Sequence, residues 1–173
     1  MIEEEASRIK LVIMDVDGVM TDGGIIYNDR GEEIKCFNVK DGQGLRLLMD
    51  AGIEVAIITG RESGAVEHRA RDLEIKHVFQ GIKDKGSICA KLLEQKGLKK
   101  DQVCCIGDDL PDIPMFYHAG LAVAVSDAAK EVRDAASYVT RNPGGKGAVR
   151  EVCELILKAL GSWPRNINAP PGK

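Results

Sequence analysis

The chain of 173 residues has few aromatic side chains and no excess of charge of one sign. Aromatic residues make up 4 % of it, and 24 basic residues against 27 acidic ones leave a formal net charge of −3. Nucleic-acid-binding proteins usually carry a strong basic excess, so a nucleic-acid partner is not expected. No stretch approaches the roughly 20 apolar residues of a membrane span, so no membrane partner is expected either. The acidic residues 1–6 lack the basic start of a signal peptide, which predicts a cytoplasmic protein.

The five cysteines show no C-x-x-C spacing, so the sequence does not predict a zinc site. Cys104 and Cys105 are adjacent within an apolar run and would point to opposite faces of a strand. We therefore expect the cysteines to be small buried hydrophobic residues in a reducing compartment.

Apolar runs alternate with segments of helical periodicity along most of the chain. Strands are predicted at residues 9–14, 53–59, 77–80, 103–106 and 121–125. Helices are predicted at residues 41–52 (with Asp41 as N-cap), 62–73, 84–96, 111–119, 127–136 and 147–160. Continuous apolar runs favour a parallel sheet covered on both faces. The fold class is therefore α/β, with a single doubly wound, Rossmann-like sheet over residues 1–160.

One segment breaks this alternation just after the first strand. Residues 24–27 and 33–37 flank the turn sequence Asn28-Asp-Arg-Gly, which predicts a small β-hairpin. The intervals from Asp17 to Asp41 and from Thr59 to Lys85 are too short to hold a cap domain. Residues 161–173 are rich in Pro, Gly and Asn and are expected to form a flexible tail.

Polar side chains follow the predicted strands where each of them ends. They are Asp15-Val-Asp17-Gly18, Thr59-Gly60-Arg61 and Gly107-Asp108-Asp109, with Lys85 at the start of a helix. In an open α/β sheet, ligands bind outside the carboxyl ends of the strands, so these positions converge on one edge. Each motif alone is weak, because Asp and Gly commonly form turns at strand ends. Together they predict one site.

The chemistry of this set is that of phosphoryl transfer. Clustered carboxylates repel one another unless a cation lies between them, and all-oxygen ligands beside a phosphate favour Mg²⁺. One carboxylate of Asp15-x-Asp17 can attack phosphorus while the other moves a proton. A hydroxyl, backbone amides and an ammonium group can hold the non-bridging phosphate oxygens.

The motifs DVDGVMTDG (residues 15–23), IITGR (57–61), Lys85 and GDDLPD (107–112) resemble the haloacid dehalogenase superfamily of phosphotransferases. The resemblance implies Asp15 as nucleophile and Asp17 as general acid and base. It implies Mg²⁺ bound by the Asp15 carboxylate, the Asp17 carbonyl and the Asp108 carboxylate. Thr59 and Lys85 would hold the phosphoryl group, and Asp109 and Asp112 would orient metal waters or Lys85.

A narrower resemblance is to the bacterial 3-deoxy-D-manno-octulosonate (Kdo) 8-phosphate phosphatases of lipopolysaccharide biosynthesis. It rests on residues 31–48, 54–63 and 144–153. The implied substrate is a small sugar-acid phosphate, whose carboxylate suits an arginine. Implied substrate-binding residues are Asp17, Asn38, Val39, Lys40, Asp41, Gly42, Arg46, Gly60, Arg61, Arg69 and Lys85; Arg46 and Arg69 could instead lie on solvated helix faces or in a subunit interface.

Without a cap domain, something else must shield the intermediate from water. The resembling family implies a homotetramer whose neighbouring subunits cover the site, with the hairpin as an interface element. Two alternatives remain open: a phosphatase for a nine-carbon, sialic-acid-type sugar acid, and a phospho-receiver signalling domain. In a receiver the phosphorylated Asp follows a middle strand, whereas here Gly60 follows the second strand and no Asp ends the third.

Overall fold

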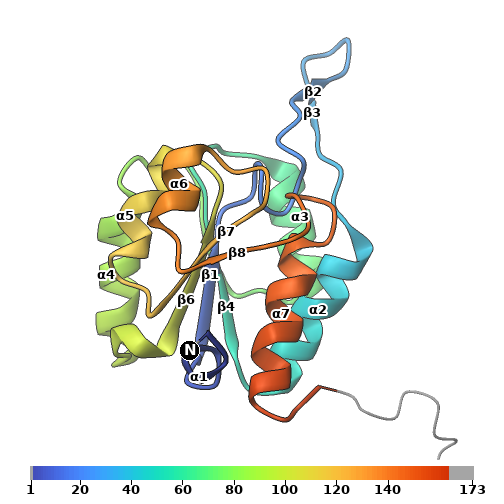
Figure 1. Cartoon of the computed structure of the whole chain (residues 1–173). Coiled ribbons are helices and arrows are strands. Elements are labelled where there is room, and N and C mark those ends of the chain that lie inside the picture. Colours follow the sequence, from blue (N-terminus) through green and yellow to red (C-terminus); the bar gives the residue numbers. More distant parts are fainter. Residues whose placement is uncertain (1, 164–173) are drawn as a thin grey trace, which may run out of the picture.

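The computed structural model describes residues 2–163, and these residues form one α/β unit with a small projecting hairpin (Figure 1). The central sheet has six parallel strands in the order β5-β4-β1-β6-β7-β8. Their bounds are β1 Leu11–Met14, β4 Glu54–Ile58, β5 His77–Phe79, β6 Val103–Gly107, β7 Leu121–Ala124 and β8 Tyr138–Val139. The hairpin pairs β2 (Ile26–Tyr27) with β3 (Glu33–Ile34) in antiparallel fashion.

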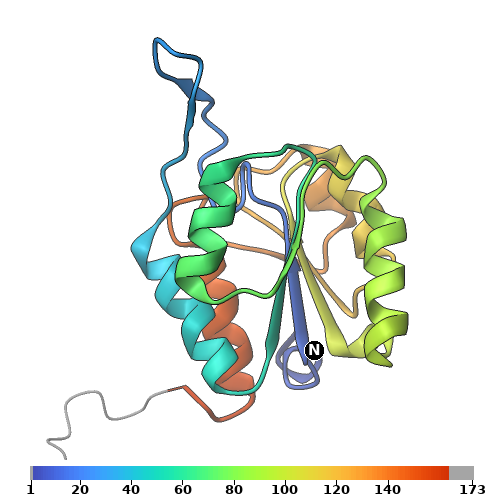
Figure 2. The ribbon, with the colours of Figure 1, turned by 180° about the vertical axis from the view of Figure 1, so that it is seen from behind.

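Helices cover both faces of the sheet, as Figures 1 and 2 show from opposite sides. On one face lie α2 (Val39–Asp50), α3 (Gly64–Leu73) and α7 (Ala148–Ala159). On the other face lie α4 (Lys85–Lys96), α5 (Ile113–Phe116) and α6 (Lys130–Ala135), while α1 (Ile2–Ala6) lies near the start of β1. Two 3₁₀ helices, Lys100–Gln102 and Leu110–Asp112, flank β6. The doubly wound α/β prediction is therefore confirmed.

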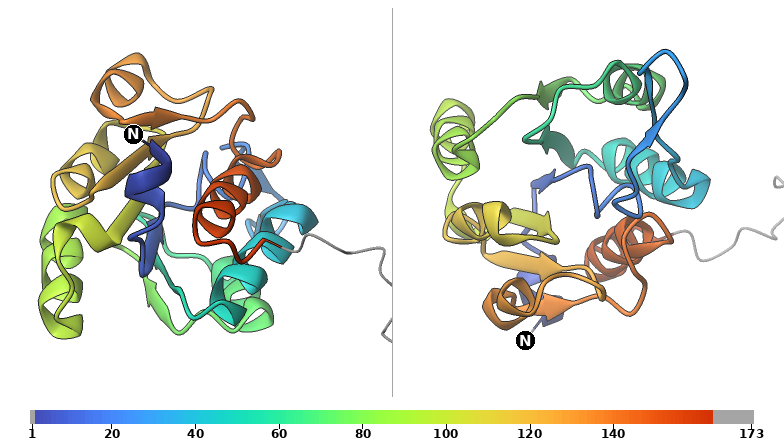
Figure 3. Two further views of the ribbon diagram at one scale, coloured as in Figure 1. Left: turned by 60° about the horizontal axis from the view of Figure 1, so that its bottom comes forward. Right: turned by 90° about the horizontal axis from the view of Figure 1, so that it is seen from above.

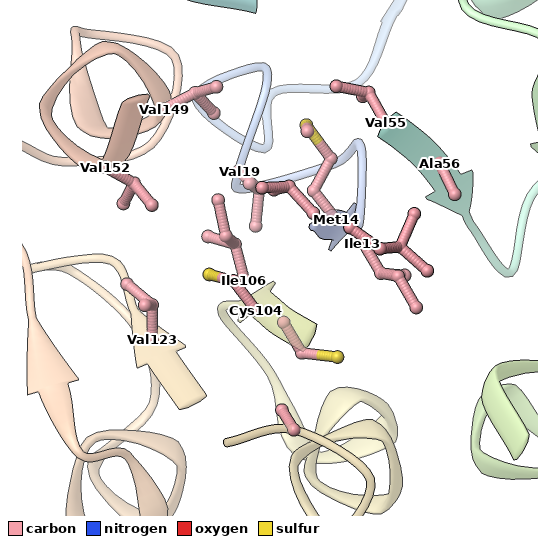
Figure 4. Close-up of a cluster of buried hydrophobic side chains, with 14 of the residues drawn as sticks. Ile13, Met14, Val19, Val55, Ala56, Cys104, Ile106, Val123, Val149 and Val152 are labelled. Atoms are coloured by element: carbon pink, nitrogen blue, oxygen red, sulfur yellow. The ribbon is translucent and has the colours of Figure 1, made fainter. Parts of the chain in front are cut away.

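The core is built from the continuous apolar strands and the helix faces packed on them (Figure 4). All four residues of β1 are fully buried, because β4 and β6 flank the strand and helices cover it on both faces. In α7, Val149 and Val152 point toward this core, as the amphipathic period of the helix predicts. Such burial on both faces is the reason that parallel strands read as unbroken apolar runs.

The local predictions hold for most elements and fail at a few positions. The predicted N-cap Asp41 is wrong: α2 begins at Val39, because the Asn38 side chain accepts hydrogen bonds from the amides of Lys40 and Asp41. The helix predicted at 111–119 ends at Phe116, and the two-residue strand β8 and the short α1 were not predicted. Four cysteines are buried as expected, but Cys36 on the hairpin arm is exposed.

The hairpin rises above the end of the sheet at which β1 finishes (Figure 1). At the other end of the chain, the Trp163 ring packs 4.9 Å from the Arg150 guanidinium, so the beginning of the predicted tail lies against α7. The rest of that predicted tail, residues 164–173, falls outside the described residues. Among the helices of residues 2–163, none is long and apolar enough to span a membrane.

Candidate active site

A cleft of about 480 Å³ lies at the carboxyl ends of the central strands. Figure 3 (right) looks down on this end of the sheet. The cleft is lined by Asp15, Asp17, Gly23, Thr59, Gly60, Arg61, Ile82, Lys83, Lys85, Asp108, Asp109, Pro111 and Asp112. The structure thus brings together the acidic, hydroxyl and cationic side chains that follow β1, β4, β5 and β6. They meet because parallel strands direct their carboxyl ends to the same edge.

Lys85 joins two carboxylates at the floor of the cleft. Its Nζ donates to Asp112 Oδ1 at 2.6 Å and lies 2.9 Å from Asp15 Oδ2. The Lys85 side chain is 3 % exposed, and burial alone would lower its pKa; the charges of Asp112 and Asp15 outweigh burial and raise the pKa instead. Lys85 is therefore a fixed cation beside the Asp15 carboxylate.

Asp15 and Asp112 have different surroundings. Asp15 Oδ1 accepts the Val16 amide at 2.7 Å. Burial and then the negative charge of Asp112 raise the pKa of Asp15, and Lys85 opposes both effects. Asp112 Oδ2 accepts the amides of Asp108 and Asp109 at 2.9 and 3.3 Å. Asp112 therefore orients both Lys85 and the loop after β6.

Asp108 supplies the observation that favours a cation. Its Oδ1 is buried and has no hydrogen-bond partner among the described residues. Carboxylate oxygens of Asp15, Asp108 and Asp112 lie within 4.8 Å of one another. Burial, Asp112 and Asp15 raise the pKa of Asp108 to about 8, because three acidic groups this close cannot all ionise without compensation. Both oxygens of Asp112 are engaged by Lys85 and two amides, whereas Asp108 keeps an oxygen with no partner among the described residues beside the Asp15 carboxylate. This pair of carboxylates fits a divalent cation.

Gly18 allows Asp108 to reach this position. Gly18 has φ +86°, and a Cβ atom there would lie 2.0 Å from Asp108 Oδ2. The backbone of Gly144 in turn packs on Gly18, and the Gly145 amide donates to the Val19 carbonyl at 2.9 Å. The turn after Asp17 is thus held between the loop after β6 and residues 144–145.

The other predicted residues of the cleft differ in their exposure and partners. Thr59 is 2 % exposed, and Gly60 lines the cleft beside it. Asp109 is exposed and its Oδ1 accepts the Leu110 amide at 2.8 Å, which begins the 3₁₀ helix Leu110–Asp112. Arg61 Nε lies 3.7 Å from Asp17 Oδ2, so its guanidinium reaches the cleft as expected from its place after Gly60.

The sequence did not single out Lys35 and Glu33, two hairpin residues that pair with Asp17 and Arg61 of the cleft. Lys35 Nζ forms an ion pair with Asp17 Oδ1, and it lies 3.3 Å from Glu33 Oε1. Glu33 Oε1 also accepts from Arg61 at 2.5 Å. The i, i+2 spacing of Glu33 and Lys35 on a predicted strand was the available signal, since such residues share a face. Lys83 lines the cleft, and the sequence did not indicate it either.

The segment expected to meet the sugar is not a loop in this structure. Asn38, Val39, Lys40, Asp41 and Gly42 form the N-cap and first turn of α2. Asp41 is 2 % exposed, and its Oδ1 accepts the Arg150 amide at 2.8 Å. None of the five is among the described residues that line the cleft. The Asn38 side chain caps α2 and the Asp41 side chain anchors it to α7 instead.

Arg46 and Arg69 also lie away from the cleft within one chain. Arg46 donates to the Asp72 carbonyl and lines a second cavity, beside the starts of β4 and β5. Arg69 donates to the Asn38 carbonyl at 3.3 Å and its guanidinium lies 5.7 Å from the Phe37 ring centre. Neither arginine is among the described residues that line the cleft.

Comparisons with known proteins agree with this geometry. Residues 77–152 match the family model described as haloacid dehalogenase-like hydrolase. The 3-deoxy-D-manno-octulosonate 8-phosphate phosphatase KdsC of Yersinia pestis is 51 % identical over 156 residues, covering 90 % of this chain and 83 % of that protein. The KdsC of Escherichia coli K12 is 48 % identical over 157 residues, covering 91 % and 84 %.

A solved structure extends the likeness to the whole described fold. The phosphatase of the same name from Moraxella catarrhalis, in complex with a magnesium ion, a phosphate ion and a KDO molecule, superimposes with a TM-score of 0.91. It is 46 % identical, and the match covers 94 % of this chain and 93 % of that one. Relationships this close over nearly the full length of both partners establish the family. The chain belongs to the 3-deoxy-D-manno-octulosonate 8-phosphate phosphatases, within the haloacid dehalogenase-like hydrolases.

Proposed function

We propose that this protein hydrolyses 3-deoxy-D-manno-octulosonate 8-phosphate to Kdo and inorganic phosphate, with Mg²⁺ and through an aspartyl-phosphate on Asp15. The observation that carries the proposal is the cleft itself, where Lys85 lies 2.9 Å from Asp15, beside an Asp108 oxygen that has no hydrogen-bond partner within residues 2–163. The choice of substrate rests on the family to which the chain belongs, since that family is named for this reaction.

In the first step an Asp15 oxygen attacks the phosphorus of the ester. A bond forms between Asp15 and phosphorus, and the bond from phosphorus to the sugar oxygen breaks. The leaving oxygen takes a proton from Asp17, which acts as general acid. Lys85, the Thr59 hydroxyl and backbone amides of the cleft hold the non-bridging oxygens, so the negative charge that develops on them is stabilised.

In the second step Asp17 acts as general base. It takes a proton from a water molecule, whose oxygen attacks the phosphorus of the aspartyl-phosphate and releases Asp15 as a carboxylate. Asp112 contributes by holding Lys85 in place, and Asp109 lies at the edge of the cleft, where it can bind metal waters.

Mg²⁺ would be bound by the carboxylates of Asp15 and Asp108 and by the backbone carbonyl of Asp17. When bound, it neutralises part of the charge that the phosphate and the nucleophile bring together. The Asp108 carboxylate suits this role, because its buried Oδ1 has no hydrogen-bond partner among the described residues and lies in a cluster with the carboxylates of Asp15 and Asp112.

Arg61 is the proposed contact for the substrate carboxylate, since it reaches the cleft from the turn after β4 with a side chain 40 % exposed. The family resemblance of Arg61 after Thr59-Gly60 also favours the eight-carbon acid over the nine-carbon alternative. Arg46, Arg69 and the start of α2 would contribute only to a site that a neighbouring subunit completes.

We further propose a homotetramer that acts in the bacterial cytoplasm, on the route to lipopolysaccharide. The hairpin supports assembly, because it exposes large apolar side chains: Ile25, Ile26, Tyr27 and Ile34 are 48–57 % exposed. Residues of this kind on a projecting two-stranded hairpin, which is marginally stable alone in water, favour burial against another subunit.

Phosphate release from a panel of sugar-acid phosphates, measured with Mg²⁺ and with EDTA, tests the proposal. Kdo 8-phosphate should turn over fastest, and EDTA should abolish the reaction. Preference for a nine-carbon sugar acid 9-phosphate would support the alternative substrate. A single phosphorylation without steady turnover would support the receiver domain.

A further inference from the structure

One cation of the hairpin arm, Lys35, pairs with the cleft residue Asp17. Lys35 lies just after β3, yet its side chain is only 3 % exposed, because it turns under the hairpin toward Asp17. Its Nζ pairs with Asp17 Oδ1 and with Glu33 Oε1. A lysine buried to this degree is rare unless it is paired, so the pairing fixes the position of both groups.

The ion pairs of Lys35 belong to a closed ring of four charges. Asp17 faces Lys35 through Oδ1 and Arg61 through Oδ2, while Glu33 Oε1 contacts both cations. Two acids and two bases alternate around the ring, so it carries no net charge. The Tyr27 hydroxyl accepts from Arg61 at 3.2 Å and adds a second link from the hairpin.

The two oxygens of Asp17 are not equivalent in this ring. Oδ1 is in direct contact with the Lys35 ammonium, whereas Oδ2 lies 3.7 Å from Arg61 Nε, beyond hydrogen-bond distance. Oδ2 is therefore the oxygen of Asp17 that no described ion pair brings within hydrogen-bond distance of a cation. The Asp17 side chain is 22 % exposed, and without Lys35 nothing among its described ion pairs would hold it within hydrogen-bond distance.

We propose that Lys35, itself held by Glu33, is a positioning residue that fixes Asp17 Oδ1 so that Oδ2 faces the leaving oxygen of the substrate. This inference rests on the proposed function, in which Asp17 gives and takes the proton. It assigns to the hairpin a role in proton transfer inside its own subunit, besides the interface role proposed above.

The test compares two phosphate esters in a Lys35→Met variant, using kcat/KM at saturating Mg²⁺. One ester is an alkyl phosphate, whose leaving oxygen needs a proton; the other is p-nitrophenyl phosphate, whose leaving group departs without one. Since kcat/KM reports the steps up to the first P–O bond cleavage, it isolates the role of Asp17 as acid. Both esters carry the same phosphate group, so weaker binding or partial unfolding lowers both values equally.

For Lys35→Met we expect a loss of about 10- to 100-fold with the alkyl phosphate and about threefold or less with p-nitrophenyl phosphate, since a positioned general acid contributes roughly 10²- to 10⁴-fold. Lys91→Met removes an exposed lysine of α4 that is not among the described residues of the cleft, and it should leave both values unchanged. Equal losses with the two esters, or no loss, would overturn the positioning role.

A Glu33→Gln variant separates positioning from charge and covers the case in which Lys35→Met does not fold. It removes a negative charge where Lys35→Met removes a positive one, so charge effects on phosphate binding have opposite signs. If positioning is correct, both variants selectively weaken turnover of the alkyl phosphate. If Glu33→Gln instead leaves the ratio of the two esters at the wild-type value, the inference fails. If the wild-type protein releases no phosphate from either ester or from Kdo 8-phosphate, the proposed function itself is contradicted, independently of either variant.

Discussion

Replacing Gly18 with alanine would place a methyl group inside the Asp108 carboxylate. The new Cβ would lie 2.0 Å from Asp108 Oδ2 and 2.4 Å from Cγ, so the Asp108 side chain would have to move. If Asp108 binds Mg²⁺ as proposed, the variant should lose metal affinity through a residue that is not itself a metal ligand. Gly52→Ala is the matched control: Gly52 has φ +84°, close to the +86° of Gly18, but no atom lies within 4 Å of its Cβ position.

The two substitutions share the cost of a positive φ and differ in the contact with Asp108. Alanine in the left-handed region costs about 1–2 kcal/mol, which lowers the thermal midpoint by about 2–8 °C in a chain of this size. At a Mg²⁺ concentration about 100 times the dissociation constant, bound metal stabilises wild type and Gly52→Ala by about 2.7 kcal/mol. If displacing Asp108 weakens binding by about 100-fold, Gly18→Ala would gain only about 0.4 kcal/mol.

Urea unfolding with and without Mg²⁺ measures this difference directly, and phosphate release gives the matching loss of activity. We expect Gly52→Ala to keep the full stabilisation by Mg²⁺ and Gly18→Ala to lose most of it. If both variants respond to Mg²⁺ like wild type, Asp108 does not bind the metal in the way proposed here.

Three further predictions concern pH, specificity and assembly. Without Mg²⁺, the free energy of unfolding should fall as pH rises from about 4 to about 8. The reason is that the folded chain keeps a proton on Asp108, whose pKa is about 8, whereas the unfolded chain releases this proton near pH 3.8. Urea unfolding measured across this pH range should show a flatter profile for Asp108→Asn. Arg61→Ala should raise KM for the sugar-acid phosphate about 10-fold or more and change KM for a small test phosphate far less; equal effects would remove its role in selecting the acid. Ile34→Ser should shift the protein toward smaller assemblies in light scattering, and an unchanged mass would argue against the hairpin as an interface element.

The fold was predictable because its signals are local. Apolar runs such as Leu11–Met14 are typical of buried strands, and Gly97 ends α4 in the left-handed conformation that glycine favours. The strand β8 was missed because two residues carry no periodicity. Asp41 was mistaken for an N-cap because Asn38, three residues earlier, is an equally good cap and the local sequence does not rank the two.

The sequence predicts the residues of the cleft only where the order of the parallel strands brings them together. Asp15, Thr59 and Asp108 follow strands that lie side by side, so their convergence is a property of any open parallel sheet. Lys35 reaches Asp17 through the path of a hairpin arm across 18 positions of sequence, and no periodicity encodes such a path. The burial of Asp41 depends likewise on α7, more than 100 residues away, whose Arg150 amide it accepts.

The central claim is that Asp15 becomes covalently phosphorylated, and rapid quenching in acid during turnover of Kdo 8-phosphate with Mg²⁺ tests it most directly. Peptide mass spectrometry should then find a phosphoryl group on Asp15 in wild type and more of it in Asp17→Asn, in which hydrolysis of the intermediate is slowed. Asp15→Asn should show neither the modification nor turnover. Near-wild-type phosphate release by Asp15→Asn would contradict the account.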